Sequence, residues 1–232
     1  MSFSKVKLKD ALYSIITDAK KDMFDKLSAQ RTNHLTVAVE NIYQEHNASA
    51  VMRTCDCFGV RDLHIIEKTN KFTIQRDIAM GAGRWVQHYH YQDSIDATKM
   101  CISSLKNNGY KIIATSPHQK SKSIYDIGID QPIALIFGTE KAGLSKKALE
   151  MADETVYIPV YGFTESYNIS VSAALCLQIL RHRLESQKEI AWLLSEEEQL
   201  DLKINWCKKI IKNPEIIEKE FISRIEMGLP IG

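Results

Sequence analysis

Short apolar runs of strand length alternate with amphipathic stretches along the middle of the chain. Apolar residues in the amphipathic stretches recur at helical spacing. Strands that alternate with helices predict an α/β fold, with a mostly parallel sheet and helices on both faces. The strands are expected at Leu35–Glu40, Leu63–Ile66, Val86–Tyr91, Tyr110–Thr115, Ile133–Phe137 and Thr155–Val160.

Capping residues indicate where the intervening helices begin and end. Asn47 can cap a helix that runs to about Phe58, because its side chain can accept a hydrogen bond from a helix-initial amide. Asp93 or Ser94 can open a second helix, and a long helix follows Asn168.

The two ends of the chain have helical patterns of their own. Apolar residues recur at helical spacing throughout 5–28, which predicts one amphipathic helix there. Ser195 and Glu198 form the capping-box pattern of a helix near the other end. We therefore expect a basic N-terminal helical extension at 1–31, an α/β domain at 32–185 and a C-terminal helical extension at 186–232.

Composition places the chain among soluble proteins. Its 232 residues are 44% hydrophobic and 25% charged, values typical of a globular domain. No stretch approaches the roughly 20 apolar residues of a membrane span, and the start lacks a signal-peptide run. The five cysteines form no Cys-x-x-Cys pair, so we expect reduced thiols and a cytoplasmic location.

The net charge of only +1 conceals a separation of charge along the chain. Residues 1–31 contain seven Lys or Arg against four Asp, a surplus of +3, whereas 185–226 contain ten acids against seven bases. The basic N-terminal segment is either a solvated helix face packed on the domain or an arm for the backbone of RNA or DNA.

Two polar loops follow two of the predicted strands within the block from Ile133 to Arg183. The first loop includes Gly138 and Glu140 and nearly matches a phosphate-binding P-loop. Leu144, however, stands where that motif needs a lysine, which argues against the P-loop interpretation. Because open α/β sheets bind ligands outside the carboxyl ends of their strands, the two loops predict a small-molecule site.

The second loop contains Ser166 and Asn168 directly before the long helix. Either residue could be a simple helix cap, worth about 1 kcal/mol. Alternatively, the helix-initial amides behind them could attract a negatively charged group.

Arg53 and a histidine pair are the remaining candidates for chemistry. Arg53 lies among apolar neighbours six residues after Asn47, so it either extends to solvent or is placed to meet a carboxylate or phosphate. His88 and His90 would share one face of a strand, but no third metal ligand is evident, and we expect no metal site.

Three segments together resemble the SpoU/TrmH branch of the SPOUT RNA 2′-O-ribose methyltransferases. Their order and spacing agree with that family over roughly residues 30–185. The segments are Asn47–Thr54, Ile136–Ser145 and Ile158–Ala174, and Met80–Trp85 resembles a further stretch of the same branch. Tyr167 stands where the family usually has leucine.

The resemblance implies a fold that composition could not indicate. It makes 32–185 a SPOUT methyltransferase domain whose C-terminal half is a deep trefoil knot, and it implies a homodimer with a site shared between subunits. S-adenosylmethionine would bind in the knot. By motif match, the residues expected to contact it are Thr115, Gly138, Ile158 and Tyr167.

The implied reaction is methyl transfer to a ribose 2′-hydroxyl, with Arg53 as a base or as an electrostatic clamp on the adjacent phosphate. A free guanidinium is an extremely weak acid that keeps its proton, so a base role would require a strongly perturbed environment. The other residues that the resemblance places at the reaction centre are Asn47, Glu140, Ser166 and Asn168.

The implied substrate is tRNA, specifically the guanosine at position 18 of the D-loop. Ribosomal RNA or another tRNA position remains an alternative. A third interpretation is a non-catalytic RNA-binding protein that retains the knot.

Overall fold

The computed structural model describes residues 3–92, 96–117, 121–140 and 142–229. The chain divides into two compact units, which we call the sheet unit and the helical unit. The sheet unit is Thr32–Trp192, and the helical unit joins both ends of the chain, Met1–Arg31 with Leu193–Gly232. Residues 186–192 thus belong with the sheet, and the two terminal segments fold together.

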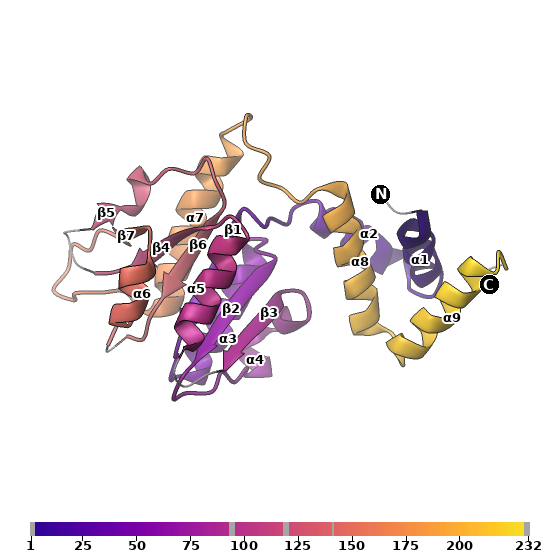
Figure 1. Cartoon of the computed structure of the whole chain (residues 1–232), viewed down its shortest axis with the longest axis horizontal. Coiled ribbons are helices and arrows are strands. Elements are labelled where there is room, and N and C mark those ends of the chain that lie inside the picture. Colours follow the sequence, from indigo (N-terminus) through magenta and orange to yellow (C-terminus); the bar gives the residue numbers. More distant parts are fainter. Residues whose placement is uncertain (1–2, 93–95, 118–120, 141, 230–232) are drawn as a thin grey trace. The chain divides into compact units, whose positions relative to one another are not determined.

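The sheet unit is built on seven parallel strands in the order β3-β2-β1-β6-β4-β7-β5 (Figure 1). This sheet confirms the predicted α/β fold. The strands are β1 (Leu35–Glu40), β2 (Asp62–Glu67), β3 (Gln87–Gln92), β4 (Lys111–Thr115), β5 (Lys122–Ser123), β6 (Ile133–Phe137) and β7 (Glu154–Tyr157).

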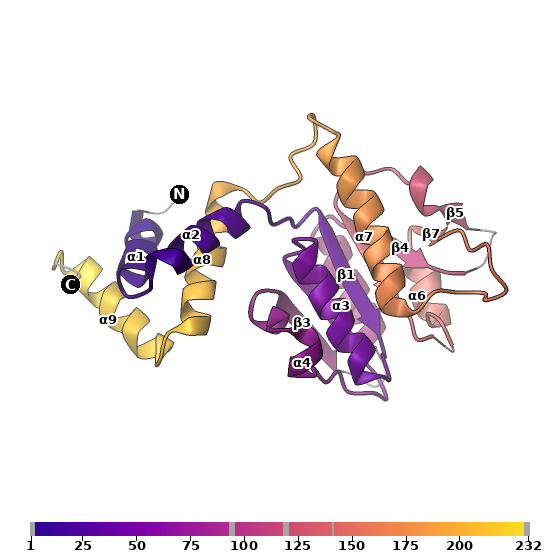
Figure 2. The ribbon, with the colours of Figure 1, turned by 180° about the vertical axis from the view of Figure 1, so that it is seen from behind.

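Helices cover both faces of this sheet. Figure 1 looks onto the face covered by α5 and α6, and Figure 2 onto the face covered by α3 and α7. Alternate residues of each strand serve the two faces: Val37 packs with α3 and α7, whereas Ala38 packs with α5 and α6. The helices of this unit are α3 (Glu45–Cys57), α4 (Arg76–Ala79), η1 (Ala82–Arg84), α5 (Ala97–Asn107), η2 (Ile124–Asp126), α6 (Lys146–Met151) and α7 (Ile169–Glu185).

Several boundaries in the sheet unit differ from the predicted ones by a single residue, and two differ by more for identifiable reasons. Helix α3 begins at Glu45 with Gln44 as its N-cap, because the Asn47 side chain is engaged by Glu140 and does not cap the helix. Strand β7 ends at Tyr157 and not at Val160, since a proline at 159 has no N–H to donate to a neighbouring strand. The predicted helix starts Asp93 and Ser94 lie outside the described residues.

The helical unit packs four helices together, and the single helix predicted over 5–28 was wrong. The chain breaks after Ser14, and Thr17 is extended, so that two short helices can both contact α8. The rings of Phe24 and Trp206 pack with centroids 5.3 Å apart. The predicted Ser195–Glu198 capping box is present. The helices are α1 (Phe3–Ser14), α2 (Asp18–Ser28), α8 (Glu196–Ile210) and α9 (Pro214–Glu226).

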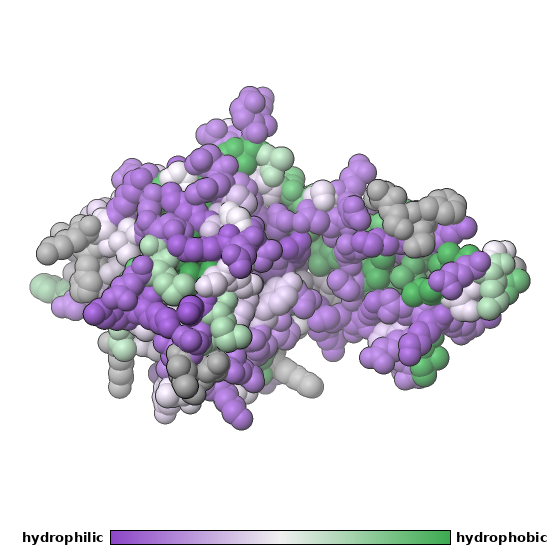
Figure 3. Space-filling view, viewed as in Figure 1, coloured by the Kyte–Doolittle hydropathy of each residue, from purple (hydrophilic) through white to green (hydrophobic). Residues whose placement is uncertain are grey.

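Opposite charges from the two chain ends meet inside the helical unit. Lys5 pairs with Glu197 and Asp201, and Lys203 pairs with Asp25. Part of the positive charge of 1–31 is therefore matched by acids of α8. Apolar residues reach the surface along α9 (Figure 3), where Ile216 is 67% exposed.

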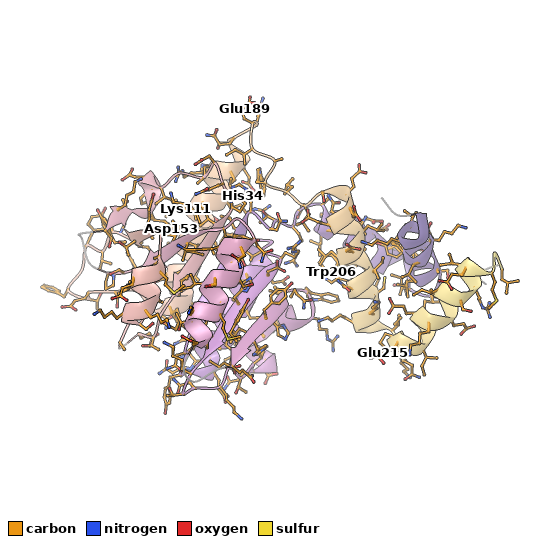
Figure 4. The ribbon with its side chains drawn as sticks, viewed as in Figure 1. His34, Lys111, Asp153, Glu189, Trp206 and Glu215 are labelled. Carbon is orange, nitrogen blue, oxygen red and sulfur yellow. The ribbon has the colours of Figure 1, made fainter. Side chains whose placement is uncertain are left out.

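The amino edge of the sheet is closed by local polar contacts. Asp153 accepts a hydrogen bond from the Ile112 amide at 2.8 Å, and His34 Nε2 lies 2.9 Å from the Ile129 carbonyl oxygen. Figure 4 shows His34, Lys111 and Asp153 at this end of the sheet. The polar loops of the predicted site leave from the opposite, carboxyl edge.

At the carboxyl edge, the buried carboxylate of Glu40 ties three segments to the end of β1. Its oxygens accept hydrogen bonds from the Ser145 amide at 2.8 Å and from Thr98 Oγ1 at 2.6 Å, and Lys68 Nζ lies 2.8 Å away. Burial alone would raise the Glu40 pKa, but hydrogen bonds from Lys68, Ser145 and Thr98 outweigh it and hold the pKa below its ordinary value.

Among the described residues, no helix is both long and apolar enough to cross a membrane.

Glu40→Gln is expected to lower the free energy of unfolding at pH 7 by about 2–3 kcal/mol, because it removes the charge that these donors share. The folded-state pKa is depressed, so the stabilisation is present above the unfolded-state pKa near 4 and is lost as pH falls through the folded-state pKa. The difference between wild type and variant should therefore shrink at acid pH. Urea unfolding followed by circular dichroism at several pH values measures it.

Glu150→Gln is the matched control, since Glu150 is exposed and its ion-pair partner among the described residues is Lys146 at the surface. Equal urea midpoints for wild type and Glu40→Gln at pH 7 would show that Glu40 does not stabilise the fold.

Candidate active site

The side chains of two asparagines, one from the first motif and one from the third, meet at a carboxylate from the second motif. Asn47 Nδ2 and Asn168 Nδ2 both donate to Glu140 Oε1, at 3.0 and 2.6 Å. Asn168 Nδ2 also lies 3.0 Å from Asn47 Oδ1. The structure therefore brings together residues that are 93 and 121 positions apart in the chain.

Each member of this cluster is placed by its own element. Asn47 is 3% exposed in the first turn of α3, and Glu140 lies in the loop after β6. Asn168 is the N-cap of α7, because its Oδ1 accepts a hydrogen bond from the Ser170 amide at 2.9 Å. Asn168 thus both caps a helix and contacts the cluster, so the two interpretations of this residue are compatible.

A cavity of about 340 Å³ opens beside the cluster at the carboxyl ends of β4, β6 and β7. Its volume falls in the range of small-ligand sites. Six of the predicted site residues line it, namely Thr115, Gly138, Glu140, Ile158, Ser166 and Tyr167. The cavity lies where strand order and direction place ligands in open α/β sheets.

Gly138 allows the first loop to close against itself. Thr139 and Gly143 exchange two backbone hydrogen bonds of 3.1 and 2.9 Å, and Gly143 is left-handed with φ +65°. A Cβ on residue 138 would lie 2.1 Å from the carbonyl carbon of Gly143. Only glycine fits there, which explains the residue type at the start of this loop.

Tyr167 has a defined role in the second loop. Its hydroxyl donates to the Pro159 carbonyl oxygen at 3.1 Å, and 36% of the side chain is exposed. The ring thus links the two ends of the loop along the cavity wall, a contact that a leucine could not make.

Arg53 is not part of the cluster within one chain. It lies on the exposed side of α3, and no hydrogen bond or ion pair to another described residue holds its guanidinium. Six residues of α-helix place it about 9 Å along the axis from Asn47 and roughly 120° around it. In a single chain, the Arg53 side chain therefore extends to solvent, which is one of the two interpretations of this residue.

The histidine pair lies elsewhere, on the edge strand β3. His90 Nδ1 is 3.0 Å from Glu67 Oε2, and the His88 and His90 rings meet edge to face at 5.4 Å. Within the described part of the chain, no three potential metal-binding side chains gather.

Sequence reasoning missed two residues that shape the site. Glu40 holds Ser145 at the end of the first loop, and Asn41, with φ 54°, accepts hydrogen bonds from the amides of Thr69 and Asn70. Both follow directly on the apolar run of β1. Polar side chains at that position were a signal that could have identified them.

The SpoU rRNA Methylase family model matches residues 34–178, well over half of the chain. The chain belongs to this family. A tRNA (guanosine(18)-2′-O)-methyltransferase of Borreliella burgdorferi is 41% identical to this SpoU methylase over 207 residues, covering 89% of the chain and 93% of the relative.

Solved structures of SpoU methylases share the fold. The crystal structure of the A. aeolicus TrmH/SpoU tRNA modifying enzyme has a TM-score of 0.75 at 28% identity, covering 84% of this chain and 98% of that one. AviRb from Streptomyces viridochromogenes, solved in complex with the cofactor AdoMet, has a TM-score of 0.57 at 19% identity. It covers 70% of this chain and 62% of that one, and it supports the fold alone.

Gly138→Ala is expected to lower the free energy of unfolding by about 1–3 kcal/mol, because the new Cβ forces the first loop of this SpoU methylase apart. Hydrogen exchange should accelerate at the amides of Thr139 and Gly143. Gly83→Ala is the matched control, since its Cβ would meet only Ile74 Cδ1 at an ordinary 3.5 Å. Unchanged exchange in Gly138→Ala would contradict the close approach.

Proposed function

We propose that this protein uses S-adenosylmethionine to methylate the 2′-hydroxyl of a ribose in tRNA, at the D-loop guanosine 18. The observation that carries the proposal is the hydrogen-bonded cluster of Asn47, Glu140 and Asn168, one residue from each family motif. Membership of the SpoU family and the 41% identity to a tRNA (guanosine(18)-2′-O)-methyltransferase support it.

The cavity at the carboxyl edge suits the cofactor. Thr115, Gly138, Ile158 and Tyr167 line it with mixed apolar and polar surface, the kind of lining that cofactor sites commonly have. When bound there, S-adenosylmethionine supplies a sulfonium methyl group. Its sulfur leaves as a neutral thioether, so the chain needs no acid for the leaving group.

The chain's own task is to activate the hydroxyl that attacks. Arg53 is the residue proposed to do so, by binding the adjacent phosphate and lowering the pKa of the hydroxyl through its positive charge. The guanidinium acts through its positive charge in this role, which fits its exposed position on α3. Ser166 and the cluster at Glu140 orient the loop beside the substrate.

A deep trefoil knot in the C-terminal half is part of the proposal. Strand β7 pairs with both β4 and β5, although it follows both of them in the chain. In a knotted chain, a late segment passes through the loop formed by an earlier connection. The position of β7 between β4 and β5 is compatible with such a passage.

We also propose a homodimer whose subunits complete each other's site. The loop beside the cavity carries Tyr161 and Phe163, which are 93% and 109% exposed. Arg53 lies apart from the Asn47 cluster of its own chain, and pairing of two chains would bring it to the cofactor bound by the other chain.

The proposed location is the cytoplasm, where tRNA is available.

The helical unit, comprising residues 1–31 and 193–232, is proposed to hold the tRNA body. Because α1 and α2 pack on α8, deleting residues 1–28 would expose the surface of α8 that they cover as well as remove positive charge. Replacing exposed lysines, such as Lys26 and Lys212, therefore gives a cleaner measure of tRNA affinity.

Ribosomal RNA is the second candidate substrate, because the matched family is described by rRNA methylation. Purified protein, labelled S-adenosylmethionine and transcripts of tRNA and ribosomal RNA separate the two. A tRNA that carries 2′-deoxyguanosine at position 18 removes the nucleophile, and it should accept no methyl group there. Cofactor binding without transfer to either RNA would support a non-catalytic knot protein.

Arg53→Lys and Arg53→Ala are both expected to reduce kcat by about 100-fold or more, because lysine keeps the charge but not the planar fork that binds phosphate. Cofactor affinity, measured by calorimetry, should stay within a few-fold of wild type. Folding is checked by circular dichroism. Near-normal turnover of folded Arg53→Ala would exclude both proposed roles of the arginine.

Asn168→Ala is expected to weaken both cofactor binding and transfer, since it removes the α7 cap and one donor to Glu140. Asn108→Ala serves as the control, because within the described part of the chain the Asn108 side chain hydrogen-bonds to Ser104 at the end of its own helix. If Asn168→Ala leaves affinity and turnover unchanged, Asn168 has no role in the site.

A further inference from the structure

A second cavity adjoins the proposed cofactor cavity across a shared wall. It encloses about 400 Å³ between the end of β1, the start of α3 and the loop after β6. Thr139, Glu140 and Ile169 line both cavities. A group bound in the second cavity therefore lies directly beside whatever occupies the first.

The second cavity has the surfaces that a flat aromatic ligand needs. Ile42 and Ile169, which are 7% and 6% exposed, provide an apolar floor. Tyr43 stands at the rim with 78% of its surface exposed, so its ring is open to stacking. Nucleobases stack on exposed aromatic rings of this kind.

One wall of the cavity is specialised to accept hydrogen bonds. Among the described residues, the contacts of Glu140 are donors from Asn47 and Asn168, and both fall on Oε1. An ionised carboxylate only accepts, so Oε2 favours a ligand that presents donors. Guanine offers two adjacent donors, N1–H and the 2-amino group, whereas adenine places the acceptor N1 beside its amino group.

Two further lining residues, Asn41 and Asn70, are held in place by hydrogen bonds within the chain. Asn41 Oδ1 accepts hydrogen bonds from the Asn70 amide at 2.9 Å and the Thr69 amide at 3.0 Å, and Asn70 Nδ2 donates to the Asn41 carbonyl oxygen. A preformed rim lowers the entropy that binding would otherwise lose.

We propose that this cavity takes the base of the nucleotide whose ribose is methylated, a guanine stacked on Tyr43 with its N1–H and 2-amino group toward Glu140. The inference rests on the proposed function, because a methylated ribose must lie beside the cofactor and its base within a few ångströms. Enzymes that act on one nucleotide commonly extrude it into such a pocket and bind its Watson–Crick edge.

Two variants of Tyr43 test the stacking contact. Tyr43→Ala should raise the KM for tRNA about tenfold or more, whereas Tyr43→Phe retains the ring and should behave as wild type. The dissociation constant of S-adenosylmethionine should not change in either. Tyr125→Ala is the matched control, since Tyr125 is 56% exposed on η2 and lines neither cavity.

Substituted transcripts test the hydrogen-bonding edge with the wild-type enzyme. Inosine at position 18 lacks the 2-amino group and should lower kcat/KM about tenfold, and adenosine should lower it further because its N1 faces the carboxylate. Equal rates for guanosine, inosine and adenosine would overturn the contact with Glu140.

The same experiments separate this inference from the function on which it rests. Methyl transfer to the guanosine transcript by wild type tests the proposed function, and its absence overturns both. Transfer that is unaffected by Tyr43→Ala overturns the base pocket alone.

Discussion

One carboxyl oxygen, Oε1 of Glu140, is the point on which the site depends. Amide donors from Asn47 and Asn168 converge on it, and these three residues come from the start of α3, the loop after β6 and the cap of α7. Hydrogen bonds to a carboxylate are stronger than those between neutral groups. The cluster therefore fixes three separate segments relative to one another, and its Glu140 is part of the wall that two cavities share.

The parallel sheet is what allows that convergence. All strands end at one edge, so loops that are distant in sequence leave the sheet side by side. Glu40 reinforces this edge by holding Ser145 and Thr98, and Gly138 lets the intervening loop fold closely on itself. The site is thus supported by hydrogen bonds that link the loops to β1 and α5 as well as by close contacts within the loops.

Two neighbouring cavities with different linings suit a reaction between two substrates. The cavity along β4, β6 and β7 offers mixed apolar and polar surface, and the one beside Tyr43 offers an exposed ring and a carboxylate. Their common wall places the contents of each within reach of the other. Arg53 stays outside this arrangement in a single chain, which makes a second copy part of the proposed chemistry.

Strands such as β1 and β6 could be predicted from sequence because burial on both faces leaves near-continuous apolar runs. The two-residue polar strand β5 has no such run and was not predicted. The family motifs likewise indicated six residues that line the cavity at the carboxyl edge. Local pattern could not reveal the break after Ser14, because packing on α8 decides it, nor that Asn47 faces Glu140 and does not cap its helix. The sequence by itself determined which residue types the chain can contribute to the site. Only the tertiary structure decided which of them meet, since contacts across 93 and 121 positions depend on the order of strands in the sheet.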